Sequence, residues 1–123
     1  MIEHTGIFVS NYKRAKEFYI KALKPLGYKL SMEHGESCGF MEGGHTSFWI
    51  VKKGRPAKGH VAFGAKSRKA VRDFHEAAMR AGGKDNGKPG LRKDYSPDYY
   101  AAFILDKDGN NIEAVCFNRV GGA

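Results

Sequence analysis

The sequence predicts an α+β fold in which two βαβββ modules form a curved mixed sheet with a cleft on its concave side. Each half of the chain has a strand, one amphipathic helix and then further strands, and a Gly- and Pro-containing linker at 52–59 separates the halves. Superposing the halves at an offset of 56 residues (60 − 4 = 56) also places His4 on His60 and Phe18 on Phe74. One helix covers only one face of a sheet, so two such modules leave a second face free to line a cleft.

The first module, about residues 1–53, begins with a strand expected at Met1–Val9. A helix follows in NYKRAKEFYIKALKPLG, where apolar residues recur at helical spacing. Asn11 is the expected N-cap, and Pro25 with Gly27 ends the helix. Three short strands separated by Gly-containing turns are expected at Tyr28–Glu33, Ser37–Met41 and Thr46–Lys52.

The second module, about residues 58–119, repeats this order with a strand at His60–Ala65 and a helix in SRKAVRDFHEAAMRAGG. Ser67 is the expected cap of this helix, and Gly82–Gly83 is its stop. A stretch rich in Gly, Lys and Pro follows and is not assigned to a strand. The last two strands, joined as a hairpin by the turn Asp106–Asn111, are expected at Tyr99–Leu105 and Ile112–Phe117.

The length and the composition of the chain fit one domain over residues 1–123. Apolar residues make up 41%, and 8 Phe, 6 Tyr and 1 Trp are enough to build a core. There is no apolar run of membrane-spanning length and no secretion signal, so we expect no membrane partner and a cytoplasmic location. Cys38 and Cys116 are too few for a disulfide framework, and we expect both to fill the core in a reducing compartment.

The formal net charge of +8 could serve nucleic acid, an anionic substrate or a solvated surface. The Lys and Arg residues are scattered along the chain, and no nucleic-acid-binding motif accompanies them. A solvated basic surface is therefore the favoured interpretation, and we expect no nucleic-acid partner.

Alternation within the strands places His4 and His60 at equivalent positions of the two modules, on strand faces otherwise lined by small residues. Glu113 lies in the last strand, within an otherwise apolar run, and a buried carboxylate needs a partner. Two imidazoles and one carboxylate form a facial set that suits a divalent metal and leaves positions open for substrate. The alternative is that each histidine is an ordinary surface residue and that Glu113 pairs with a lysine. His34, His45 and His75 lack this repeat support and are expected at the surface.

The segment Gly87–Tyr100 is long, basic and aromatic, and it precedes a strand expected beside the cleft. It could form a lid in which basic and aromatic side chains contact an anionic substrate, or it could be an ordinary surface loop. The candidates for substrate binding there are Arg92, Lys93 and Tyr95, and those for catalysis are Tyr99 and Tyr100.

The segments HTGIFVSNYKRAKEFY, GHVAF and FILDKDGNNIEAV together resemble the vicinal oxygen chelate superfamily, which includes glyoxalase I, bleomycin-resistance proteins, fosfomycin-resistance thiol transferases and extradiol dioxygenases. The resemblance covers essentially the whole chain. It implies paired βαβββ modules, usually a homodimer, and a divalent ion (Zn, Mn, Fe, Ni or Co) held by His4, His60 and Glu113.

Departures from the family pattern restrict the reaction. Glyoxalase I has a fourth ligand in the last strand of its first module, where this chain has Trp49 (Phe48 or Ser47 if the register slips). The resemblance to fosfomycin-resistance enzymes makes Trp49 and Lys93 substrate-binding candidates, but Ala101 and Phe103 replace expected hydroxyl residues.

The function that the resemblance implies is that of a divalent-metal-dependent enzyme. It would act as a lyase, thiol transferase or dioxygenase on a small substrate chelated through vicinal oxygens. The alternative is a bleomycin-resistance type of protein that binds a small molecule without chemistry.

Overall fold

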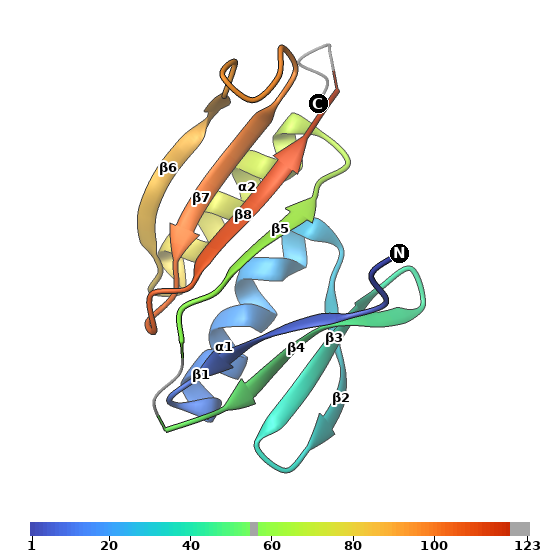
Figure 1. Cartoon of the computed structure of the whole chain (residues 1–123), viewed down its shortest axis with the longest axis vertical. Helices are drawn as coiled ribbons and strands as arrows, with labels where there is room; N and C mark the ends of the chain where they lie inside the picture. The colour runs from blue at the N-terminus through green and yellow to red at the C-terminus, as the bar shows by residue number, and fades with distance from the viewer. Residues whose placement is uncertain (55–56, 119–123) are drawn as a thin grey trace.

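The computed structural model describes residues 1–54 and 57–118, and within them the chain forms two βαβββ modules (Figure 1). The first module has one four-stranded sheet in the order β1-β4-β3-β2, with β1 parallel to β4. Its elements are β1 (Thr5–Val9), α1 (Tyr12–Leu23), the 3-10 helix η1 (Lys24–Leu26), β2 (Lys29–His34), β3 (Ser37–Glu42) and β4 (His45–Lys52).

The second module has the equivalent sheet, in the order β5-β8-β7-β6, with β5 parallel to β8. Its elements are β5 (His60–Gly64), α2 (Arg68–Arg80), β6 (Lys84–Leu91), β7 (Tyr100–Leu105) and β8 (Asn111–Cys116). The fold class expected from the sequence is confirmed. Within one chain, however, the strands make two separate sheets, and β1 and β5 are each an edge strand.

The strand registers confirm the internal repeat. Gly6 of β1 is paired with Trp49 of β4, and Ala62 of β5 is paired with Glu113 of β8. The offset between Gly6 and Ala62 is 56 residues (62 − 6 = 56), the same as the offset between the two histidines. Trp49 therefore occupies the position in the first sheet that Glu113 occupies in the second.

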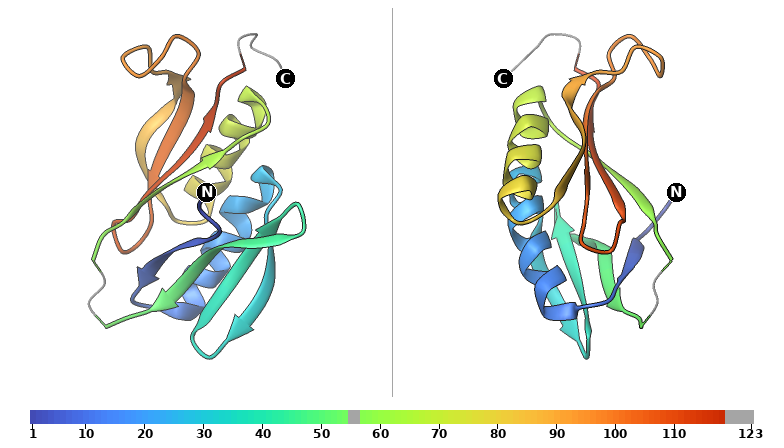
Figure 2. Two further views of the ribbon diagram at one scale, coloured as in Figure 1. Left: turned by 45° about the vertical axis from the view of Figure 1, so that its right-hand side comes forward. Right: turned by 90° about the vertical axis from the view of Figure 1, so that its left-hand side faces the viewer.

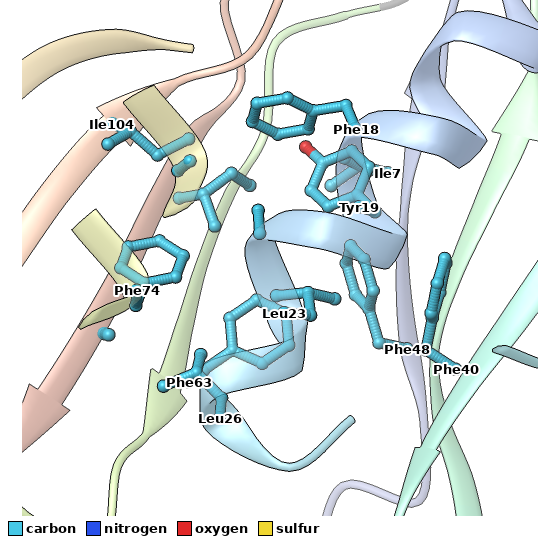
Figure 3. Close-up of a cluster of buried hydrophobic side chains, with 14 of the residues drawn as sticks. Ile7, Phe18, Tyr19, Leu23, Leu26, Phe40, Phe48, Phe63, Phe74 and Ile104 are labelled. Atoms are coloured by element: carbon cyan, nitrogen blue, oxygen red, sulfur yellow. The ribbon is translucent and has the colours of Figure 1, made fainter. Parts of the chain in front are cut away.

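Both helices cover the same side of the two sheets, as the right-hand view of Figure 2 shows. A single apolar core lies between the helices and the sheets and crosses the boundary between the modules (Figure 3). Phe48 of β4 packs edge-on against Phe63 of β5, with their ring centroids 5.0 Å apart. Cys38 and Cys116 are both buried in this core, as expected. Because both helices lie on one side, the other faces of the two sheets point away from the helices and are not covered by them.

Local sequence signals set the helix ends. The side chains of Asn11 and Ser67 accept hydrogen bonds from the backbone N–H groups of Arg14 and Ala70, so both expected N-caps are confirmed. Gly27 has a φ of 86°, a left-handed conformation that lets the chain turn sharply after η1. Neither helix within the described residues has the length and apolar character needed to cross a membrane.

The structure differs from the expectation at β6, which lies in the stretch that was not assigned to a strand. This segment is an edge strand paired with β7 only, and its register shifts twice, around Gly87. Edge strands and bulges tolerate the glycines and the proline that disfavour a central strand. The expected loop is thus shorter than 87–100 and covers the residues between β6 and β7. The interior of the expected linker (55–56) and the end of the second module (119) lie outside the described residues.

The hairpin turn after β7 contacts the first module. Asp106 accepts a 2.6 Å hydrogen bond from the Tyr19 hydroxyl of α1. Asn110 is fully buried, donates to the Phe8 carbonyl at 3.2 Å and accepts from the Gly59 N–H at 2.7 Å. The turn therefore connects β8 to α1, to β1 and to the linker.

Candidate metal centre

Glu113 is a buried carboxylate, with 2% of its surface exposed, in the middle of β8. One of its oxygens, Oε1, lies 3.2 Å from His60 Nε2 at the start of β5. The other, Oε2, accepts a hydrogen bond from the Tyr99 hydroxyl. The partners of Glu113 are therefore a histidine and a tyrosine of its own module, and no lysine pairs with it among the described residues.

The orientation of His60 is set by its other ring nitrogen. Nδ1 lies 3.0 Å from the backbone carbonyl of Asn111. A carbonyl can only accept, so Nδ1 carries the proton, and in the neutral ring Nε2 has a lone pair directed at Glu113 Oε1. Two acceptor atoms that face each other at this distance need either a proton or a metal ion between them.

Tyr99 holds the second carboxylate oxygen of Glu113. Partial burial, together with the hydrogen bond to Glu113, raises the pKa of Tyr99 to about 12. The phenol therefore stays protonated near neutral pH and acts as a donor that orients the carboxylate. A hydrogen bond of this kind is a usual support for a metal-binding carboxylate.

His4 has a comparable arrangement in the first module. It immediately precedes β1, its side chain is 59% exposed, and its Nδ1 is hydrogen-bonded to the Glu3 carboxylate. That hydrogen bond also lowers the pKa of Glu3, so this carboxylate remains charged and keeps the proton on Nδ1. Nε2 of His4 is thereby left with the lone pair, as in His60.

The three expected ligands do not converge within one chain. Among residues 1–54 and 57–118, no group of three or more His, Cys, Asp or Glu side chains is placed to hold a metal ion. The structure brings together His60 and Glu113, and it places His4 at the edge of the other sheet. Each half of the expected site lies next to an edge strand, β5 or β1.

A hollow of about 300 Å³ lies beside Glu113 on the open face of the second sheet. Its lining includes Arg92, Tyr95 and Phe103, and Phe103 is paired with Glu113 in the register of β7 and β8. The Arg92 guanidinium lies 5.4 Å from the centroid of the Phe103 ring and donates to the backbone carbonyls of Lys88 and Gly90. Two of its five N–H groups are used in these bonds, and a guanidinium that lines the hollow is a suitable partner for an anionic group.

Two other candidate residues from the same segment lie elsewhere. Lys93 is exposed, and the hollow beside Glu113 is lined by its neighbour Arg92 instead. Tyr100 pairs with Cys116, packs against the core on the helix side of the sheet, and has the Arg68 guanidinium 5.0 Å from its ring centroid. Of the two tyrosines expected to act in catalysis, only Tyr99 reaches Glu113.

A second hollow, of about 330 Å³, lies on the open face of the first sheet. Its lining includes His4, Gly6, Phe8, Trp49 and Val51. Trp49, a candidate for substrate binding, is therefore brought together with the candidate ligand His4.

The remaining histidines differ from one another. His34 and His45 are exposed, as expected. His75, also expected at the surface, is only partly exposed, because its side chain is 14% exposed and its Nε2 lies 2.8 Å from Asp85. This contact links α2 to β6, a strand that the sequence did not predict.

Sequence reasoning missed the residues that orient the candidate ligands. Glu3 holds His4, and the Asn111 carbonyl holds His60. The proximity of Glu3 to His4 in the sequence was an available signal. The contact with Asn111 depends on the parallel register of β5 and β8.

Comparisons with known proteins agree with this architecture. The model of the Glyoxalase/Bleomycin resistance protein/Dioxygenase superfamily matches residues 1–114. A glyoxalase/bleomycin resistance protein from Albidiferax ferrireducens T118 has a similar crystal structure, with 27% identity, a TM-score of 0.81, and coverage of 93% of this chain and 96% of that chain. A family enzyme from Burkholderia phytofirmans PsJN shares the fold at 15% identity and a TM-score of 0.73, over 95% of this chain and 98% of that chain. No curated protein matches the chain significantly.

The chain thus belongs to the glyoxalase/bleomycin resistance protein/dioxygenase superfamily. The superfamily includes enzymes as well as binding proteins, so membership alone does not assign an activity.

Proposed function

We propose that this protein is a divalent-metal-dependent enzyme whose metal site is shared between two copies of the chain. The observation that carries the proposal is the pairing of His60 Nε2 with Glu113 Oε1 at 3.2 Å, with Nδ1 of the same ring held by a carbonyl. This donor set fits a first-row divalent ion, because the neutral imidazole and the carboxylate both direct lone pairs to one point.

His4 of the partner subunit would supply the third ligand. Within one chain, β1 and β5 are both edge strands, and His4 and His60 lie at the starts of these strands. Placing β1 of one copy parallel to β5 of another would satisfy both unpaired edges and bring the two histidines together, because each lies at the start of its strand. The site would then be incomplete in an isolated chain, which accords with the separation of His4 from the His60–Glu113 pair.

Each residue of the proposed site would have its own role. When bound, the metal would supply Lewis acidity toward two adjacent oxygens of the substrate. Tyr99 would hold Glu113 in its ligating orientation, and Arg92 would bind an anionic group beside it. The chain has Trp49 where a fourth ligand would stand, so that position would contact substrate instead of metal. Lyase, thiol-transferase and dioxygenase reactions are all compatible with this arrangement.

The metal content of purified protein tests the proposal. Wild-type protein incubated with Zn, Mn, Fe, Ni or Co and then desalted should retain one divalent ion per site, measured by elemental analysis. His60→Ala and Glu113→Ala should lose it, whereas His34→Ala should keep it because this exposed histidine lies outside the centre. Wild-type protein that remains metal-free with all five ions would overturn the proposal.

The second candidate is a protein that binds a small molecule without chemistry. Each open sheet face has a hollow lined by aromatic side chains, Phe8 and Trp49 in one and Tyr95 and Phe103 in the other. If metal-free protein binds aromatic compounds tightly and no metal is retained, this function replaces the first.

A further inference from the structure

We propose that the hollow on the first sheet binds a planar aromatic ring that carries a carboxylate, and that this ring stacks on Trp49. The identification of this ligand as the substrate rests on the proposed function, but the binding of the ring does not. The site is built from residues of one chain.

The indole of Trp49 lies against Gly39 of the neighbouring strand β3. Gly39 of β3 is paired with Trp49 of β4. A Cβ atom built on Gly39 would lie 3.0 Å from both Cε2 and Cζ2 of the indole and 2.5 Å from Thr46 Cγ2. Real Cβ atoms essentially never lie as close as the 2.5 Å contact with Thr46, and the 3.0 Å contacts with the indole are tighter than usual, so glycine at position 39 gives the indole room to lie against β3.

A second glycine, Gly6, lies on the other side of Trp49 in strand β1. Gly6 of β1 is also paired with Trp49, and a Cβ atom there would lie 3.0 Å from the Trp49 carbonyl oxygen and 3.4 Å from Trp49 Cβ. Glycines thus flank Trp49 on both adjacent strands. The residues paired with Trp49 thus carry no side chains that cover it, and Trp49 is half-buried and lines the hollow.

Two apolar side chains beside Trp49 also line the hollow. Phe8 and Val51 are paired in register and line the same hollow, yet they are 38% and 36% exposed. They lie on the sheet face opposite the helices, so no core residue of the described chain covers them. Apolar side chains that gather around an indole in a concave site are typical of a pocket for an aromatic ligand.

A positively charged side chain, Lys53, lies beside Phe8. Lys53 Nζ lies over the Phe8 ring, 4.5 Å from its centroid, so an ammonium group lies close to one of the side chains that line the hollow. A ring that stacks on Trp49 beside Phe8 can therefore direct an acidic substituent to Lys53, a charge-assisted contact. Charge complementarity selects an aromatic carboxylate over an uncharged aromatic compound.

The intrinsic fluorescence of the protein gives a direct test, since Trp49 is the single tryptophan of the chain. Metal-free protein in EDTA is titrated with benzoate, with benzyl alcohol, which keeps the ring without the charge, and with cyclohexanecarboxylate, which keeps the charge without the aromatic ring. Benzoate should change the emission saturably, and the other two should bind about three- to tenfold more weakly, as expected for the loss of one stacking or one ionic contact. Equal affinity for benzoate and cyclohexanecarboxylate would overturn the proposal.

Variants measured by calorimetry separate stacking from general apolar contact. Trp49→Phe keeps an aromatic surface and should retain most of the benzoate affinity, whereas Trp49→Leu should lose about tenfold. Gly39→Ala should displace the indole from its position against β3. It should therefore weaken binding, although residue 39 does not line the hollow. If Trp49→Leu binds benzoate as the wild type does, the ring does not stack on Trp49, and the proposal fails.

Different results would contradict the proposed metal enzyme and the proposed aromatic site. Benzoate binding in EDTA without metal retention would retain the aromatic site and remove the metal enzyme. Metal retention without a benzoate response would remove the aromatic site alone. An emission change that appears on dilution of the protein without ligand, and no response to benzoate, would show that a second copy of the chain fills the hollow, and would overturn the ligand proposal.

Discussion

The Tyr19 hydroxyl donates a 2.6 Å hydrogen bond to Asp106 Oδ2, joining the helix of the first module to the hairpin turn of the second. Asn110 Nδ2 donates to the same oxygen at 2.9 Å, and the backbone N–H groups of Asp108 and Asn110 donate to Oδ1 at 2.9 and 2.8 Å. The buried carboxylate is thus held by four donors. The turn residues DKDGN do more than close a hairpin, because they also fix the second module on the first.

Tyr19→Phe should destabilise the protein by about 1–3 kcal/mol, because it removes one donor from a buried carboxylate while the ring remains. Urea denaturation followed by circular dichroism measures this loss. Tyr28→Phe is the matched control, since Tyr28 packs its ring on Phe63 and no hydrogen bond of its hydroxyl is found among the described residues. The control should change the free energy of unfolding by less than about 0.5 kcal/mol. Equal effects of the two substitutions would show that the contact with Asp106 contributes nothing.

Tyr99→Phe should weaken metal binding by about 10- to 100-fold, because Glu113 loses the hydroxyl that orients its Oε2. Competition with a chelator of known affinity measures the change. Tyr95→Phe serves as the control, since Tyr95 is 66% exposed and contacts Tyr99 through its ring. An unchanged metal affinity in Tyr99→Phe would remove this residue from the support of the centre.

Stability should fall as the pH rises from 10 to 12, and Tyr99 should contribute to the fall. The pKa of Tyr99 is raised from 10.0 to about 12 in the folded protein, so the unfolded chain releases this proton first and ionisation favours unfolding in that window. The contribution is fully present below pH 10 and is lost as the pH approaches 12. Urea midpoints measured across this range should decrease less steeply for Tyr99→Phe than for the wild type. Parallel curves would contradict the assignment.

The sequence predicted the helices and most strands because their signals are local. Asn11 and Ser67 cap their helices by side-chain contacts with residues three positions away. The equivalence of Trp49 and Glu113 also followed from the repeat, and the strand registers confirm it. β6 was missed because its two glycines and its proline are typical of loops, and pairing with β7 overrides that preference.

The candidate site could be predicted only in part. His60 and Glu113 meet because β5 and β8 are parallel neighbours, which the repeat predicts. The contact of Tyr99 with Glu113 required the position of the short loop before β7. His4 does not join this pair within the described residues of one chain. In the proposed shared site its relation to them depends on how copies of the chain associate, which local sequence patterns do not encode.

The metal content of mixed chains tests the central claim most directly. His4→Ala and Glu113→Ala are each purified metal-free, mixed, unfolded and refolded together, and then incubated with a divalent ion. If the site is shared, each heterodimer contains one intact set, with His4 from the Glu113→Ala chain and with His60 and Glu113 from the His4→Ala chain. The mixture should then bind metal, whereas either variant alone should not. A mixture that contains heterodimers and stays metal-free, beside wild-type protein that binds metal, would contradict the shared site.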